Sequence, residues 1–132
     1  MKRLLVASLL TLGLIAAVAA CGSSSFALRG AVSIDINGRS VIGGPEMCSG
    51  FFGYGDITEG AAVTVYDSSG KIIATGKLQK GTAPDRQVCR LPFEVANVPG
   101  GEDFYQIEVA QRGRATFSAE EAKSGNINMG AG

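Results

Sequence analysis

Past residue 25 the chain consists of short runs of β-branched and other apolar residues, separated by turns rich in Gly, Asn, Asp and Pro. Within several runs an apolar residue occupies every second position, as it does along a strand with one buried face. This pattern predicts strands over residues 27–36, 39–42, 61–66, 71–80, 89–95, 105–109, 114–117 and 126–129. We therefore predict an all-β fold, an antiparallel β-sandwich of about seven to eight strands.

Local signals mark the ends of these runs. Asn37-Gly38 is the dipeptide favoured in type I′ turns, where both central residues need a positive φ, and it predicts a hairpin between the first two strands. Ser118 followed by Glu121 matches a capping box, with Ser118 as N-cap and Glu121 at N3. One short helix, of one or two turns, is therefore expected near the C-terminus.

The first 20 residues have a different character. Lys2 and Arg3 precede an apolar run over residues 4–18, and the small residues Ala19 and Ala20 follow it. This is the layout of an export signal, with a positive region, an apolar region and small residues before the cleavage site. A retained transmembrane helix is the alternative, but the run is only about 17 residues long and no stop-transfer cluster of charges follows it.

The residue that follows this leader is Cys21. The stretch Val18-Ala19-Ala20-Cys21 resembles the lipobox of bacterial lipoproteins. The resemblance implies that a diacylglyceryl group is joined to Cys21 by a thioether, that the leader is cleaved after Ala20, and that the new amino terminus is acylated. Two or more acyl chains hold a protein stably on a bilayer, at about 0.8 kcal/mol per buried CH₂. The alternative is an ordinary secretory signal followed by an unmodified cysteine.

These boundaries predict a lipoprotein signal peptide over residues 1–20, a Gly/Ser tether over 21–25 and a β-sandwich domain over 26–132. The expected location is the extracytoplasmic face of the cell membrane. The lipid bilayer is the first expected partner, through acylated Cys21.

Two cysteines remain once Cys21 is assigned to lipid. Cys48 and Cys89 form an even pair in an oxidising compartment, so we predict a disulfide between them. A redox-active pair is the alternative, but these cysteines lack the Cys-x-x-Cys spacing and the chain has no histidine to activate a thiol.

A second resemblance is carried by the segments Val63–Asp67, Gly70–Gly76, Phe93–Val95, Val98–Gly101 and Tyr105–Val109. They are similar to prealbumin-like modules, namely transthyretin-like, carboxypeptidase-regulatory-like and Cna-B-like β-sandwiches. Together with the lipobox they make the chain resemble small actinobacterial lipoproteins. The resemblance implies a stalk or interaction role more often than catalysis, and no lysine–asparagine isopeptide set of the Cna-B kind can be assigned here.

Composition argues against several kinds of chemistry. The chain has no histidine, the commonest general base and transition-metal ligand. Its 12 basic and 12 acidic residues balance, and no basic stripe indicates nucleic-acid binding. The glycines around Tyr54 lack the spacing of a nucleotide-binding loop, and no twelve-residue calcium loop is present. We therefore predict no enzyme activity, no cofactor and no metal.

The segment Gly43–Gly60 contains six glycines and is expected to be a long loop. Phe51, Phe52 and Tyr54 form an aromatic cluster within it, close to Asp56. We expect the rings to fold back over one end of the sandwich, because a small domain with few aromatic residues normally buries them. The alternative is that these four residues bind a ligand, and exposure of two rings together would favour it.

Two functions of different classes follow. The first is a non-catalytic interaction or adaptor module for an envelope protein, displayed at the membrane. The second is a lipoprotein that binds a glycan or a small apolar molecule through Gly43–Gly60, which a deep apolar pocket lined by the aromatic rings would support. A hydrolase, which would need acidic groups converging in a cleft, comes third.

Overall fold

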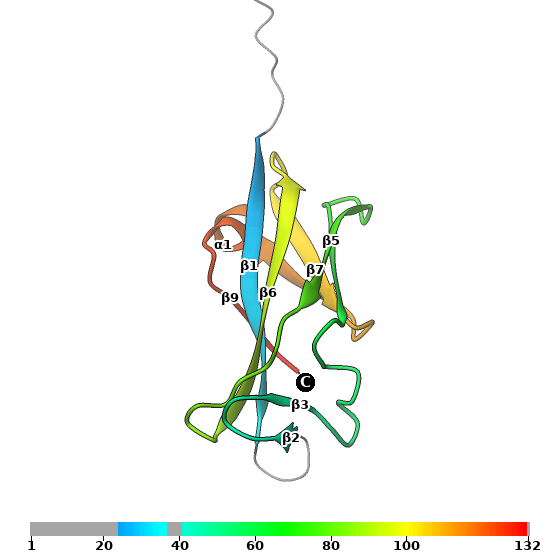
Figure 1. The fold of residues 1–132 in the computed structure, drawn as a ribbon. Coiled ribbons are helices and arrows are strands. Elements are labelled where there is room, and N and C mark those ends of the chain that lie inside the picture. The colour runs from blue at the N-terminus through cyan, green and yellow to red at the C-terminus, as the bar shows by residue number, and fades with distance from the viewer. Residues whose placement is uncertain (1–23, 37–40, 132) are drawn as a thin grey trace, which may run out of the picture.

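The computed structural model describes residues 24–36 and 41–131. The elements within these ranges are β1 (Ser25–Asp35), β2 (Val41–Gly43), β3 (Cys48–Gly50), β4 (Ala62–Tyr66), β5 (Ile72–Leu78), β6 (Val88–Pro99), β7 (Phe104–Val109), β8 (Arg114–Ser118), α1 (Ala119–Lys123) and β9 (Ile127–Gly130). The predicted all-β fold with one short helix near the C-terminus is confirmed (Figure 1). The predicted signal peptide, Cys21 and the Asn37-Gly38 turn lie outside the described residues.

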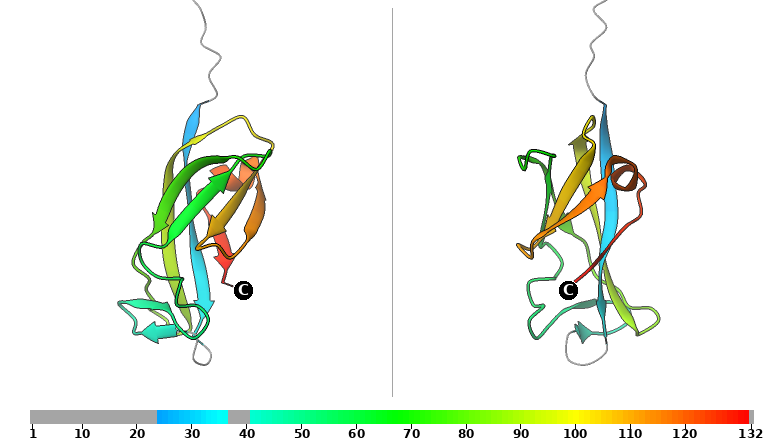
Figure 2. Two further views of the ribbon diagram at one scale, coloured as in Figure 1. Left: turned by 90° about the vertical axis from the view of Figure 1, so that its right-hand side faces the viewer. Right: turned by 180° about the vertical axis from the view of Figure 1, so that it is seen from behind.

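Seven of these strands form one sheet in the order β8-β7-β4-β5-β6-β1-β9. Neighbouring strands are antiparallel except β1 and β9, which run parallel. The sheet curls so that its two halves face each other across the core, and α1 lies at one end, between β8 and β9 in the chain (Figure 2). The remaining strands, β2 and β3, form a separate two-stranded sheet.

The core follows the predicted alternation of apolar and polar residues. In β6, Leu91 and Val95 are fully buried, whereas Arg90 and Glu94 face the solvent. Each fully buried aliphatic side chain of this size contributes about 1.5–3 kcal/mol of hydrophobic free energy. Two-residue periodicity therefore identified the inner face of the sheet correctly.

The capping box of α1 is also confirmed. Ser118 Oγ accepts a hydrogen bond from the Glu121 backbone N–H at 3.1 Å, and Glu121 Oε2 accepts one from the Ser118 N–H at 2.7 Å. Such a cap contributes about 1 kcal/mol, which matters for a helix of five residues. The helix buries Ala122 and so seals one end of the curled sheet.

One predicted pairing is wrong. The described part of the expected return strand, Val41 and Ile42, does not pair with β1 but lies in β2, which pairs with β3. β1 instead has one edge fully paired and the other paired in part. β6 pairs with one edge from Ser25 to Asp35, and β9 pairs with the other over Gly30–Ser33.

The length of β1 separates two ends of the domain. Eleven residues at about 3.3 Å each extend about 36 Å. Ser25 begins the strand at one end, and β2 and β3 lie at the opposite end, which we call the distal end (Figure 1).

Candidate functional site

The predicted disulfide fastens the distal end to the main sheet. Cys48 of β3 and Cys89 of β6 are joined at an S–S distance of 2.04 Å, with Cα atoms 6.0 Å apart, and both residues are buried. The Cys48 N–H also donates to the Gly81 carbonyl at 2.9 Å. This confirms the predicted disulfide, and its burial in the core fits a structural bond rather than a reactive pair.

The turn after β3 has an unusual conformation for its sequence. The Tyr54 N–H donates to the Phe51 carbonyl at 3.2 Å, and the two central residues have positive φ, 44° at Phe52 and 85° at Gly53. Positive φ at both positions is typical of a type I′ turn, which favours Asn-Gly. A phenylalanine in this conformation costs on the order of 1 kcal/mol.

The rings at this turn are exposed. Phe51 is 44% and Phe52 is 67% solvent-accessible, and the two rings meet edge to face with centroids 5.3 Å apart. Tyr54 is half-buried. The expectation that the rings fold back over the domain is therefore wrong for Phe51 and Phe52. The backbone explains the outcome, because the bonded turn 51–54 places these two residues beyond the end of β3.

Two further apolar side chains of this region are exposed. Ile42 of β2 and Met47 of the β2–β3 turn are 53% and 65% accessible. We call Ile42, Met47, Phe51 and Phe52 together the hairpin surface. In the described part of the chain, only one other large apolar side chain is as exposed, that of Ile72 in β5.

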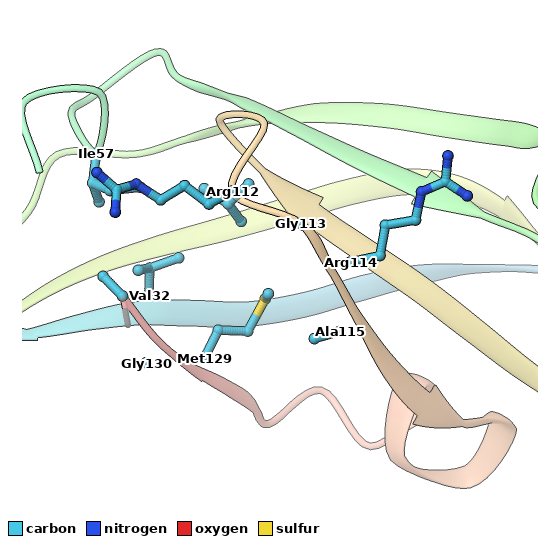
Figure 3. Close-up of a pocket in the computed structure, with 10 residues that line it drawn as sticks. Val32, Ile57, Arg112, Gly113, Arg114, Ala115, Met129 and Gly130 are labelled. Carbon is cyan, nitrogen blue, oxygen red and sulfur yellow. The ribbon is translucent and has the colours of Figure 1, made fainter.

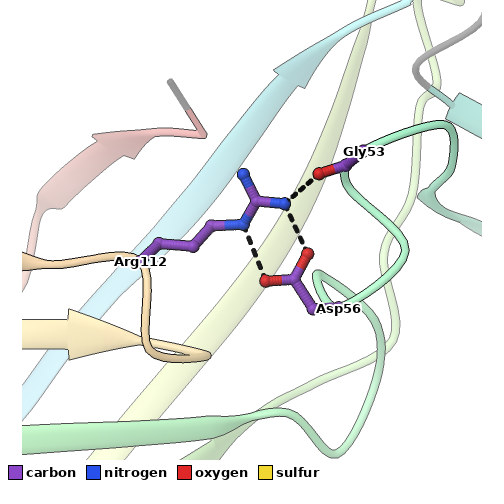
Figure 4. A network of polar contacts seen from close by, with 3 residues as sticks. All are labelled: Gly53, Asp56 and Arg112. Atoms are coloured by element: carbon purple, nitrogen blue, oxygen red, sulfur yellow. Dashed lines mark hydrogen bonds and ion pairs between the residues drawn. The ribbon is translucent and has the colours of Figure 1, made fainter.

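Arg112 holds the loop that carries these rings. Its guanidinium donates to Asp56 Oδ2 at 2.7 Å and to Asp56 Oδ1 at 2.5 Å, and a further bond goes to the Gly53 carbonyl (Figure 4). The guanidinium carbon also lies 4.7 Å from the centroid of the Tyr54 ring. The hydrogen bonds from Arg112 lower the pKa of Asp56 below its ordinary value, which keeps the pair ionised. Asp56, considered above as a ligand-binding residue, is thus engaged within the protein.

Ile57 and Gly50 complete the fixation of the loop. Ile57 is buried in the core, and its carbonyl accepts the Gly50 N–H at 2.8 Å. A Cβ at position 50 would lie 1.9 Å from the Tyr54 carbonyl oxygen, so only glycine fits there. The loop is therefore held by a disulfide, an ion pair and a buried side chain, and Phe51 and Phe52 are presented on a fixed backbone.

Cavities lie beside the hairpin surface but not beneath its rings. One of about 270 Å³ is lined by Ile42, Met47 and Lys80, among others. A second, of about 290 Å³, lies next to Val41 and Arg86. Neither includes Phe51, Phe52 or Tyr54, so neither is the deep aromatic pocket that would support small-ligand binding.

A third cavity lies between the two edge strands of the main sheet. Its volume is about 220 Å³, and Ala115 of β8 and Met129 of β9 are among the residues that line it (Figure 3). Core residues, including Val32 and Ile57, also line it. Arg112 and Arg114, from the turn before β8 and from β8 itself, add two positive side chains to the lining.

Two acidic side chains in other loops, Asp67 and Asp85, stabilise their own turns. Asp67 Oδ1 accepts from the Ser69 and Lys71 N–H groups, each at 2.9 Å, and Asp85 Oδ1 accepts from the Gln87 N–H at 2.9 Å. The hydrogen bond from the Ser69 hydroxyl, at 2.7 Å, together with the backbone bonds, lowers the pKa of Asp67. Backbone bonds lower the pKa of Asp85. Within the described ranges no group of three or more His, Cys, Asp or Glu residues could hold a metal ion.

Among residues 24–36 and 41–131, no helix has the length and apolar character needed to cross a bilayer. No family model, curated protein or solved structure matches this chain. Interpretation of the distal end therefore depends on its own geometry.

Sequence reasoning missed the role of Arg112. It was visible only as part of a turn, Arg112-Gly113, and no local signal links it to Asp56, 56 residues earlier. The positive φ of Phe52 was equally hidden, although the Gly53 that follows it is a common turn residue.

Proposed function

We propose that this protein is a lipid-anchored, non-catalytic docking module. Acylated Cys21 holds it on the extracytoplasmic face of the cell membrane, and its hairpin surface binds another protein of the envelope. The observation that carries the proposal is the joint exposure of Phe51 and Phe52 at the end of the domain opposite Ser25.

The energetics of this region support a role in binding. Exposing two phenylalanine rings forgoes the free energy of burying them, and the positive φ of Phe52 adds strain. Both costs fall on a loop that a disulfide and an ion pair hold in place. A rigid, exposed aromatic pair is a favourable anchor for a protein partner, because little conformational entropy is lost on binding.

The position of the surface supports the same conclusion. The predicted tether is short, since β1 already begins at Ser25, and β1 extends about 36 Å from there toward the distal end. An anchor at Cys21 would therefore place the hairpin surface away from its own bilayer, where envelope proteins are accessible.

A glycan is the alternative partner. Exposed ring faces can stack on sugars, and this is the one feature that favours it. A small apolar ligand has less support, because the cavities beside the surface do not include the rings.

The test uses a photocrosslinking amino acid placed at Phe52 in the anchored, full-length protein in intact cells. The matched control carries it at Ile72, which has 55% exposure on β5. We expect a discrete protein adduct from position 52 that position 72 does not give and that Phe51→Ser abolishes. Adducts that are the same at both positions, or absent from both, would refute protein docking. An adduct removed by glycan-degrading enzymes rather than by protease would support the glycan instead.

A further inference from the structure

The two strands at the distal end differ in what lies beside them. β3 is an inner strand, because β2 pairs with one of its edges while Gly81 and Ile57 accept hydrogen bonds along the other. β2 is an outer strand, and its partner among the described residues is β3 alone. Among residues 24–36 and 41–131, therefore, no strand pairs with the second edge of β2.

The register identifies the backbone groups on that second edge. The Gly44 N–H donates to the Met47 carbonyl at 2.8 Å, so this pair is hydrogen-bonded. Hydrogen-bonded and non-bonded pairs alternate in an antiparallel ladder, so Ile42 bonds inward to Ser49. The N–H and C=O groups of Val41 and Gly43 then point outward.

The two cavities at the distal end are lined by successive residues of β2. Ile42 and Met47 line the one of about 270 Å³. Val41 lines the one of about 290 Å³ together with Pro45 and Ala83. Gly43, which has no side chain, borders both. In strand addition, backbone bonds give affinity and alternate side chains fill separate pockets. An edge of β2 without a partner among the described residues, with one cavity at Val41 and another at Ile42, matches these requirements.

We propose that β2 binds an extended segment of another envelope protein as an added strand. The segment would pair with Val41 and Gly43 and place apolar side chains alternately into the two cavities. This inference rests on the proposed docking function and specifies how the partner binds.

Geometry favours another protein over the other occupants. β2 and β3 lie at the end of the domain opposite the start of β1 (Figure 1). With the anchor proposed above, two copies joined distal end to distal end would have their tethers pointing in opposite directions, which conflicts with anchoring in one bilayer. The protein's own bilayer would lie beyond the Ser25 end of β1.

Charge at the edge adds a feature of the expected segment. Arg86 borders the cavity on the Val41 face, and it forms no ion pair with the described residues. A carboxylate in the bound segment would complement it. We therefore expect an extended segment with apolar residues at alternate positions and an acidic residue on the Arg86 side.

The experiment selects random 12-residue peptides, displayed on phage, for binding to the full-length lipoprotein in nanodiscs. Val41→Pro removes one outward N–H, and proline is tolerated on a strand edge that faces solvent. We expect it to weaken the selected peptides by about tenfold or more, the cost of one backbone hydrogen bond plus steric conflict. Val41→Ala, the control, keeps the N–H and is expected to weaken them less.

Two further measurements remain decisive if Val41→Pro fails to fold. The amide protons of Val41 and Gly43 in the wild type should exchange more slowly when a selected peptide is bound. N-methylation of single residues in the peptide should abolish binding only at every second position, where the peptide N–H bonds to β2. Failure to select any peptide, insensitivity to Val41→Pro, or unprotected Val41 and Gly43 amides would overturn strand addition. Retention of the position-52 crosslink in Val41→Pro cells would overturn strand addition while leaving docking at the aromatic pair intact.

Discussion

The guanidinium of Arg112, in the turn between β7 and β8, forms a two-bond ion pair with the carboxylate of Asp56, at 2.7 and 2.5 Å. The two residues are 56 positions apart in the sequence. Their contact fastens the loop that carries Phe51 and Phe52 to the main sheet. Because the same guanidinium binds the Gly53 carbonyl, it acts directly on the turn that presents Phe52.

Replacing Arg112 should loosen the loop more than it destabilises the domain. Arg112→Gln removes the paired hydrogen bonds, and we expect a loss of about 0.5–1 kcal/mol, since the Asp56 side chain is 42% exposed. Amide exchange over residues 51–57 should accelerate. Arg112→Lys, the control, keeps the charge but lacks the two-pronged geometry, and should be intermediate. Unchanged exchange in Arg112→Gln would show that the ion pair does not hold the loop.

The ion pair should make stability depend on pH in the acid range. Arg112 holds the pKa of Asp56 below its unfolded value, so the stabilisation is fully present above that unfolded value, about 3.9, and is lost as the pH falls through the folded pKa. Asp67 and Asp85 have lowered pKa values as well, so the comparison is with Asp56→Asn. The difference in unfolding free energy between wild type and variant should be constant above about pH 5 and shrink below about pH 4. A difference that grows on acidification would contradict the assignment.

Phe52→Asn should stabilise the protein while removing its docking contact. Asparagine adopts positive φ with less strain than phenylalanine. We therefore expect the free energy of unfolding, measured with a chemical denaturant, to rise by about 0.5–1 kcal/mol. Phe52→Ala removes the ring but keeps the strain, and should show no comparable gain. Because position 52 is mutated in these variants, the photocrosslinking amino acid is placed at Ile42 instead. We expect both variants to give a lower yield of the partner adduct than the protein with Phe52. A less stable Phe52→Asn protein would mean that the ring contributes more to folding than its exposure indicates.

Loss of the disulfide should affect the whole domain. It closes a loop with a sequence separation of 41, and the double variant Cys48→Ser/Cys89→Ser is expected to lose about 4 kcal/mol. Thermal unfolding with and without reductant measures this, because reductant should lower the midpoint of the wild type and leave the double variant unchanged. Equal midpoints for reduced and oxidised wild type would contradict a stabilising role.

Cys21→Ser should release the protein from the membrane or leave it unprocessed. Intact-mass spectrometry of the membrane-extracted wild type should show cleavage after Ala20 and added acyl mass, and the variant should lack both the acyl mass and membrane association. A variant that is still trimmed, acylated and membrane-bound would rule out Cys21 as the anchor.

The disulfide shows how far counting and periodicity can reach. With Cys21 set aside, only Cys48 and Cys89 were left to pair, and they do pair. Cys89 also follows the alternation of apolar residues in β6, so its burial could be predicted from the sequence. The hairpin shows the limit. Asn37-Gly38 is a strong local turn signal, yet β1 pairs with β6 and β9, because each edge of a strand accepts one neighbour and those partners come from distant parts of the chain.

The sequence by itself determined where most strands form, which side chains they bury, where the helix is capped and which cysteines pair, because each depends on local spacing or simple parity. The exception is β3, which lies inside the expected Gly43–Gly60 loop, because three residues are too few to show a periodic pattern. Only the tertiary structure decided that Phe51 and Phe52 stay in solvent, that Arg112 meets Asp56, and that no strand of the described residues pairs with the second edge of β2. The exposure of a side chain and the pairing of a strand edge depend on which distant segments pack against them. The spacing of residues along the chain does not specify those contacts.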